Sequence, residues 1–230
     1  MRTLSPTSIR DDFLAALVDV ETTFQAAESA GINAAGMKLI TEFSFLSAAI
    51  LFEGYISDLF VAYINRDSSV FSAHLVGKMV IETIDPHAKR AKSLATISIH
   101  QRLTAADIRS VLDSRDYNIT FPTVAEMKTG AGQWLAPSFK AYFVNLTASH
   151  AAILSATKTM RNFLAHRSGA SKNEMQTALA ASDLPASLRR GQHTIRDVGS
   201  FLRSRPTPQE SLRFNQYLQA LNQIGNALCP

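Results

Sequence analysis

Apolar residues recur every three or four positions over most of the chain, a spacing that places them on one face of an α-helix. The first such run predicts a helix that Thr7 or Ser8 caps and that ends at Gly31. The apolar stripe of this helix consists of Phe13, Leu17, Val20 and Phe24. We therefore expect one side of the helix to pack against the rest of the protein.

The second run, from about Leu39 to Asn65, is apolar on most of its faces, which predicts a long helix at the centre of a bundle. Its most apolar part, from Phe43 to Ile64, has the length of a membrane span. Glu53 and Asp58 interrupt it, however, and two carboxylates at that spacing are unfavourable in lipid. A buried bundle helix is therefore the better interpretation.

The rest of the chain predicts shorter helices and shows no alternation typical of β-strands. Capping signals predict helix starts at Thr104, Thr123 and Thr207. The segment 129–137, which contains two Gly and Trp134, is predicted to be a loop. Further helices are predicted over 70–83, from 138 into the segment around 161–166, over 171–181 and around 195–202. The prediction is an all-α protein with a helical bundle at its centre, in a single domain over residues 1–230.

Charge is unevenly distributed along the chain. Residues 1–155 carry 13 Lys and Arg against 15 Asp and Glu, whereas residues 156–230 carry 10 against 4. We expect this basic C-terminal third to face a polyanion, and a solvated surface rich in Arg is the alternative. Arg189, Arg190 and Arg196 are candidate contacts to an RNA backbone, and they lack the interleaved aromatic residues that would stack on bases.

Cysteine and histidine usage excludes two kinds of site. The single Cys229, a thiol near the end of the chain, cannot form an internal disulfide, which fits a reducing compartment such as the cytoplasm. The six His residues lack the spacing of metal ligands, so neither a metal nor another cofactor is expected. The chain shows no apolar stretch typical of a signal peptide after Arg2.

The candidate catalytic residues lie in the stretch Arg161-Asn162-Phe163-Leu164-Ala165-His166. It resembles the Arg-Asn-x-x-x-His motif of the HEPN superfamily of all-helical ribonucleases and nucleotide-binding domains, especially the RiboL-PSP-like branch. The apolar helix around Glu53 is similar to an early helix of that family, in which one acidic residue interrupts a buried face. The resemblance covers roughly residues 40–170 and leaves additional C-terminal helices over 171–230. It implies a metal-independent endoribonuclease that acts as a toxin or defence effector.

Each residue type fits this chemistry. A His166 imidazole can take the proton of a ribose 2′-hydroxyl, whose oxygen then attacks the adjacent phosphorus and leaves a 2′,3′-cyclic phosphate. Arg161 can hold the phosphate oxygens, and Asn162 can orient His166 or bind the phosphate itself. Glu53 is expected either to support an Arg such as Arg161 or to lie at the edge of the bundle. Arg167 is expected either to contact phosphate or to end the helix in solvent.

Helix geometry separates the two main residues of the motif. Positions five apart diverge by about 140° around a helix, so Arg161 and His166 do not share one face. Two copies facing each other across a two-fold axis could pool their side chains, and the resemblance implies such a homodimer with a composite site. A toxin also needs restraint, for which an antitoxin-like inhibitor protein is the candidate partner. The alternative is a non-catalytic HEPN-like module for RNA binding, nucleotide binding or dimerisation. Convergence of the Arg161 and His166 side chains on an open basic cleft would favour the nuclease, and a His166 buried against apolar side chains would favour the module.

Overall fold

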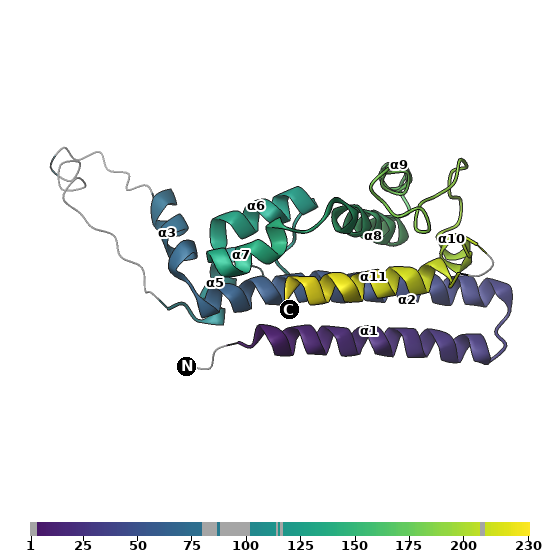
Figure 1. Cartoon of the computed structure of the whole chain (residues 1–230), viewed down its shortest axis with the longest axis horizontal. Coiled ribbons are helices and arrows are strands. Elements are labelled where there is room, and N and C mark those ends of the chain that lie inside the picture. Colours follow the sequence, from purple (N-terminus) through teal and green to yellow (C-terminus); the bar gives the residue numbers. More distant parts are fainter. Residues whose placement is uncertain (1–3, 80–86, 88–101, 114, 116, 208–209) are drawn as a thin grey trace.

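The computed structural model describes residues 4–79, 87, 102–113, 115, 117–207 and 210–230. All regular structure in these residues is helical, in ten helices, which confirms the predicted all-α class. Three long helices run along the molecule, namely α1 (Pro6–Ser29), α2 (Ala34–Arg66) and α11 (Arg213–Leu228) (Figure 1). α1 and α11 both pack against α2, and the shorter helices lie on the side of α2 opposite α1 (Figure 1).

α2 is the central helix of the fold. It begins at an Asn33 cap, whose side chain accepts a hydrogen bond from the Gly36 amide. From Tyr55 to Asn65 every residue except Asp58 is buried, as expected for a helix with neighbours on all sides. By length and composition α2 is apolar enough to cross a membrane, but 61% of its most apolar window is buried inside the protein. The core helix of a bundle has the same properties.

α1 runs antiparallel to α2 and begins before the predicted caps (Figure 1). Either Thr7 or Ser8 was expected to cap it, but the Ser5 hydroxyl accepts the hydrogen bond from the Ser8 amide at 3.2 Å, and proline occupies the first helical position. The predicted end is confirmed, because Gly31 adopts a positive φ of 69° immediately after the helix. Phe13 of the apolar stripe stacks on Tyr55 of α2.

The C-terminus is bound to the core through its backbone carbonyls. The Tyr55 hydroxyl donates to the Gly225 carbonyl at 2.8 Å, and the Tyr63 hydroxyl donates to the Leu228 carbonyl at 2.7 Å. Burial raises the pKa of both tyrosine hydroxyls, which therefore stay protonated and donate. Cys229 is buried, so the single thiol belongs to the core.

The Tyr63→Phe variant should be less stable by about 1–3 kcal/mol, because it leaves the buried Leu228 carbonyl without its donor. Urea unfolding followed by circular dichroism would show this as a lower midpoint with an unchanged slope. Tyr117→Phe is the matched control, since Tyr117 is 71% exposed. Equal midpoints for the two variants would mean that the Tyr63 hydroxyl does not stabilise the C-terminus.

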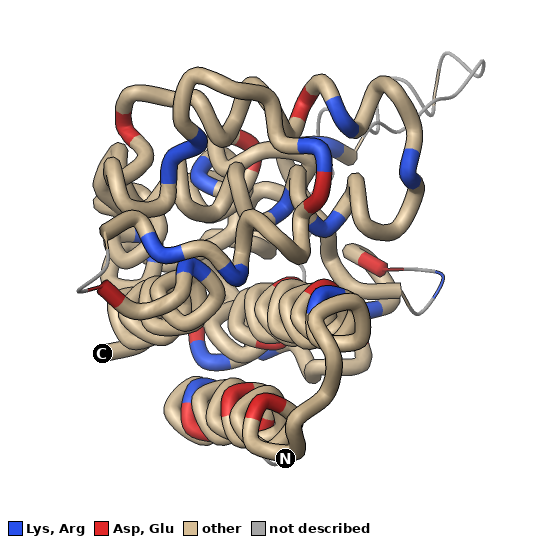
Figure 2. The backbone as a smooth tube through the Cα atoms, turned by 90° about the vertical axis from the view of Figure 1, so that its right-hand side faces the viewer, with Lys and Arg blue, Asp and Glu red and all other residues tan. Residues whose placement is uncertain are grey.

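The shorter helices form a second layer over α2 and α11. They are α3 (Ser69–Lys78), α5 (Ala105–Leu112), α6 (Val124–Trp134), α7 (Pro137–Val144), α8 (Ala148–His166), α9 (Gly169–Ala178) and α10 (Val198–Arg203). An aromatic cluster joins the layers, since the Phe60 ring of α2 lies 4.8 Å from the Phe121 ring and 4.6 Å from the Phe143 ring. Seen along the long axis, Lys and Arg are distributed around this second layer, with no single basic side (Figure 2).

The prediction of a loop over 129–137 is wrong except at Leu135 and Ala136. α6 continues to Trp134, and only Leu135 and Ala136 separate it from α7. Gly130 lies within this helix, and the Phe121 ring packs so close to it that a Cβ there would come within 2.8 Å of that ring. Trp134 packs on Phe60 and belongs to the aromatic cluster.

Two later predictions also need correction. The signal at Thr207 does not start the last helix, because α11 begins at Arg213. Within that signal, the Glu210 side chain accepts a hydrogen bond from the Thr207 amide at 3.1 Å. The motif therefore closes a turn and does not cap a helix; residues 208–209 lie outside the described residues.

The segment from 138 onwards is two helices, α7 and α8, and Thr147 caps the second of them. The helix expected around 195–202 is the short α10.

Candidate functional site

The three motif residues lie in the last two turns of α8. This helix buries Met160, Phe163 and Leu164 against the core, which leaves Arg161 and Asn162 half-buried and His166 exposed. It ends because Arg167 adopts a left-handed conformation with φ 51°, the one residue other than glycine with a positive φ in the described chain. The core packing of α8 therefore determines which motif side chains reach the surface.

Arg161 is held against α2 by the acidic residue that the sequence singled out. Its Nη2 lies 3.2 Å from Oε2 of Glu53, and its Nη1 donates to Oδ1 of Asn162 at 3.1 Å. Both charged side chains are about three-quarters buried, at 29% and 27% exposed, so solvent only partly screens the pair. The predicted pairing of Glu53 with Arg161 is thus present in the structure. Nε of Arg161 is buried and has no partner among the described residues.

His166 is exposed at the C-terminal end of α8. In the described part of the chain, no hydrogen bond or ion pair connects it to Arg161. Five positions separate them, so their side chains leave the helix in different directions, as the spacing predicts. Asn162 lies one turn before His166 and next to Arg161, and it is the residue placed to connect the two. The two side chains therefore lie on different sides of α8 and do not converge on one cleft within a single chain.

Arg167 contacts protein and is not free in solvent. Its Nη2 lies 2.5 Å from Oε2 of Glu42 on α2, and its guanidinium stacks over the Phe163 ring at 5.4 Å. Glu42 also accepts a hydrogen bond from the Gly199 amide at 3.1 Å, at the start of α10. Arg167 is still 52% exposed, but it ties the end of α8 to α2. These contacts give the residue a structural role that its sequence position did not suggest.

The three other predicted RNA contacts are not equivalent. Arg189 donates to the backbone carbonyls of Ser182 and Leu184, and Arg190 donates to the Gln176 carbonyl at 3.0 Å. Both guanidinium groups therefore stabilise the irregular segment after α9. Arg196 is exposed, which leaves it the most accessible of the three.

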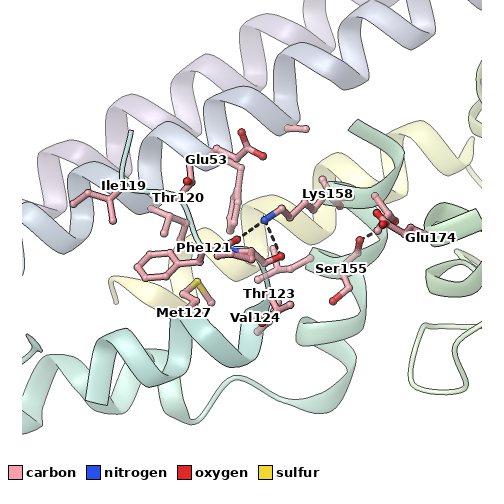
Figure 3. Close-up of a pocket in the computed structure, with 17 residues that line it drawn as sticks. Glu53, Ile119, Thr120, Phe121, Thr123, Val124, Met127, Ser155, Lys158 and Glu174 are labelled. Carbon is pink, nitrogen blue, oxygen red and sulfur yellow. Dashed lines mark hydrogen bonds between the residues drawn. The ribbon is translucent and has the colours of Figure 1, made fainter. Parts of the chain in front are cut away.

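A cavity of about 440 Å³ lies between α2, the segment 119–123, α6 and α8, and Glu53, the partner of Arg161, is one of its lining residues (Figure 3). Lys158 reaches across its edge and donates to the carbonyls of Phe121 and Pro122 (Figure 3). Burial lowers the pKa of the Lys158 ammonium and nearby Arg161 lowers it further, while Glu53 opposes this shift. Sequence reasoning missed Lys158, although its position three residues before Arg161 on a helix was a usable signal.

No group of three or more His, Cys, Asp or Glu that could hold a metal ion is found among the described residues. The polar groups around Arg161 are one carboxylate, one amide and one ammonium. These groups can bind and orient an anion or a polar ligand.

Comparison with known proteins finds no match, since neither a family model nor a curated protein nor a solved structure matches the chain. The likeness to HEPN ribonucleases therefore depends on the motif residues and on the helix around Glu53.

Proposed function

We propose that this protein is a metal-independent endoribonuclease of HEPN type, with Arg161, Asn162 and His166 as its catalytic residues. One observation carries the proposal. Glu53 and Asn162 hold the Arg161 guanidinium in a fixed orientation, and His166 is exposed one turn after Asn162. Half-buried and oriented cations stabilise developing charge better than mobile surface ones.

The ion pair with Glu53 leaves Arg161 able to bind phosphate. A guanidinium has five N–H donors, and Glu53 and Asn162 each occupy one nitrogen. His166, being exposed, can approach a ribose 2′-hydroxyl and remove its proton. The 2′-oxygen then forms a bond to phosphorus, the P–O5′ bond breaks, and a proton is returned to the leaving 5′-oxygen. The products are a 2′,3′-cyclic phosphate and a 5′-hydroxyl.

We further propose that two copies of the chain form the working enzyme. Leu39, Phe43 and Ile50 of α2 are 53%, 61% and 46% exposed, and Leu46 is partly exposed between them. Their spacing of four, three and four residues forms one apolar stripe of the kind that pairs with another helix. Of the adjoining side chains, Ser44 and Ser47 are uncharged, and Lys38 and Glu42 are paired with Asp197 and Arg167. Glu53 lies three residues beyond Ile50, which brings this stripe close to Arg161.

The second candidate function is a non-catalytic module that binds RNA or nucleotide, or that only dimerises. The observation that favours it is the same ion pair, because Glu53 neutralises much of the charge that Arg161 would offer to phosphate. A His166 buried against apolar side chains would favour this module further, whereas His166 is exposed. A cytoplasmic toxin or defence effector that an inhibitor protein restrains is the role that the catalytic proposal implies.

The purified protein should cut single-stranded RNA equally well with and without EDTA, because the 2′-hydroxyl supplies the nucleophile and no metal is needed. Denaturing gels would follow the cleavage, and mass spectrometry should find 2′,3′-cyclic phosphate ends. A DNA strand of the same sequence is the matched control and should remain intact, since it lacks the 2′-hydroxyl. Activity that EDTA abolishes and Mg²⁺ restores would contradict the mechanism.

A further inference from the structure

The cavity beside Arg161 has the form of a small-molecule site. Its volume of about 440 Å³ lies within the range of about 300–1,000 Å³ that is usual for ligand pockets. Apolar side chains make up most of its lining, among them Phe52, Ile56, Phe121, Val124, Met127 and Leu154. Such walls accept a flat apolar ring.

The polar groups of the cavity are few and differ in kind. Glu53 contributes a carboxylate with one oxygen bound to Arg161, and a carboxylate can accept about four hydrogen bonds. The Lys158 ammonium has three donors and uses two of them on backbone carbonyls. Thr157 lines the same cavity, and its buried hydroxyl has no partner among the described residues. A buried hydroxyl without a hydrogen-bond partner favours the binding of a ligand that supplies one.

The cavity shares residues with the proposed phosphate clamp. Glu53 is a wall of the cavity and at the same time the partner of Arg161. Lys158 and Thr159, which also line it, lie three and two residues before Arg161 on α8. A nucleotide whose phosphate binds Arg161 would therefore have its base beside the mouth of the cavity.

We infer that the cavity is a base-binding subsite and that guanine is the base it selects. Guanine presents two adjacent N–H donors, which a carboxylate such as Glu53 accepts, and an O6 acceptor for the remaining donor of Lys158. Adenine has a different pattern of hydrogen-bond donors and acceptors on this edge, since it lacks the second donor and the O6 acceptor. This inference rests on the proposed ribonuclease function, because it places the guanine of the RNA substrate next to the phosphate that is cut.

Guanosine monophosphate is the probe, and fluorescence of Trp134 is the readout. Trp134 is the single tryptophan of the chain, and its ring lies 5.9 Å from that of Phe121 in the cavity wall. The full chain should bind guanosine monophosphate about 10-fold more tightly than adenosine, cytidine or uridine monophosphate. Mapping of RNA ends should place the cuts beside guanines.

Val124→Phe should abolish this binding, because the larger side chain fills the cavity that Val124 lines. Val111→Phe is the matched control and should bind normally, since Val111 is 51% exposed on α5. Glu53→Gln should reduce the preference for guanosine over adenosine monophosphate, a ratio that a general loss of folding does not change. Circular dichroism of each variant establishes its folding.

The outcomes separate this inference from the proposed function. RNA cleavage without guanine bias, together with equal affinity for all four nucleotides, overturns the guanine subsite and leaves the ribonuclease standing. Selective guanosine monophosphate binding by a protein that cuts no RNA overturns both the ribonuclease and the RNA subsite, and indicates a receptor for a free nucleotide.

Discussion

Replacing His166 with Ala should reduce the rate of RNA cleavage by about 100- to 10,000-fold, the usual contribution of a positioned general base. The side chain is exposed at the end of α8, so its removal should leave the fold intact. Initial rates on a fluorescent single-stranded RNA would measure the loss. Growth and total RNA of cells that express either protein would show whether the same residue accounts for toxicity.

His193→Ala is the matched control, because His193 is also an exposed histidine but lies outside the motif. It should retain the wild-type rate. If the His166→Ala protein is folded and cleaves as fast as this control, then His166 is not the base and the non-catalytic module becomes the better proposal. His166→Ala should still bind RNA while its turnover falls by the stated factor, because Arg161 and its partners remain in place.

Arg161→Ala and His166→Ala, each inactive, should recover activity when they are refolded together. In a mixed dimer one chain still supplies Arg161 and the other still supplies His166, so one of the two composite sites remains intact. Random association should restore about a quarter of wild-type activity, since about half of the dimers are mixed and each has one site. Rates before and after refolding, at equal protein concentration, would measure the recovery.

The same experiment tests the apolar stripe on α2. Phe43→Glu should prevent the recovery and give a monomer in size-exclusion chromatography, because it places a charge in the middle of the stripe. Tyr117→Glu is the control, since Tyr117 is an exposed aromatic residue outside α2. Mixed dimers that form but stay as inactive as both parents would show that the site is not divided between chains.

Local patterns were enough to predict much of the scaffold. The apolar stripe of α1 and the apolar faces of α2 identified both helices, because burial of a helix face leaves a period of three to four residues in the sequence. The Thr104 capping box is present as predicted, since its hydrogen bonds join residues only three positions apart. Such signals need no information about the rest of the chain.

Local patterns failed where a distant contact overrides them. Gly130 suggested a loop, yet it lies within α6 at a point where the Phe121 ring leaves no room for a side chain, a contact that helix propensity does not indicate. The signal at Thr207 has the residues of a helix start, yet it closes a turn before α11. The same residues can serve either structure, and the packing of the neighbouring elements selects between them.

For the candidate site, too, the sequence identified the residues and the tertiary structure decided their contacts. The sequence identified Arg161, Asn162 and His166 as a group and suggested Glu53 as a partner, because the motif is short and Glu53 interrupts an apolar helix. The distance between Glu53 and Arg161, the cavity at Lys158 and the pairing of Arg167 with Glu42 all depend on how α8 lies across α2. That placement results from many apolar contacts between segments far apart in the chain, and a pattern over a few residues does not contain it.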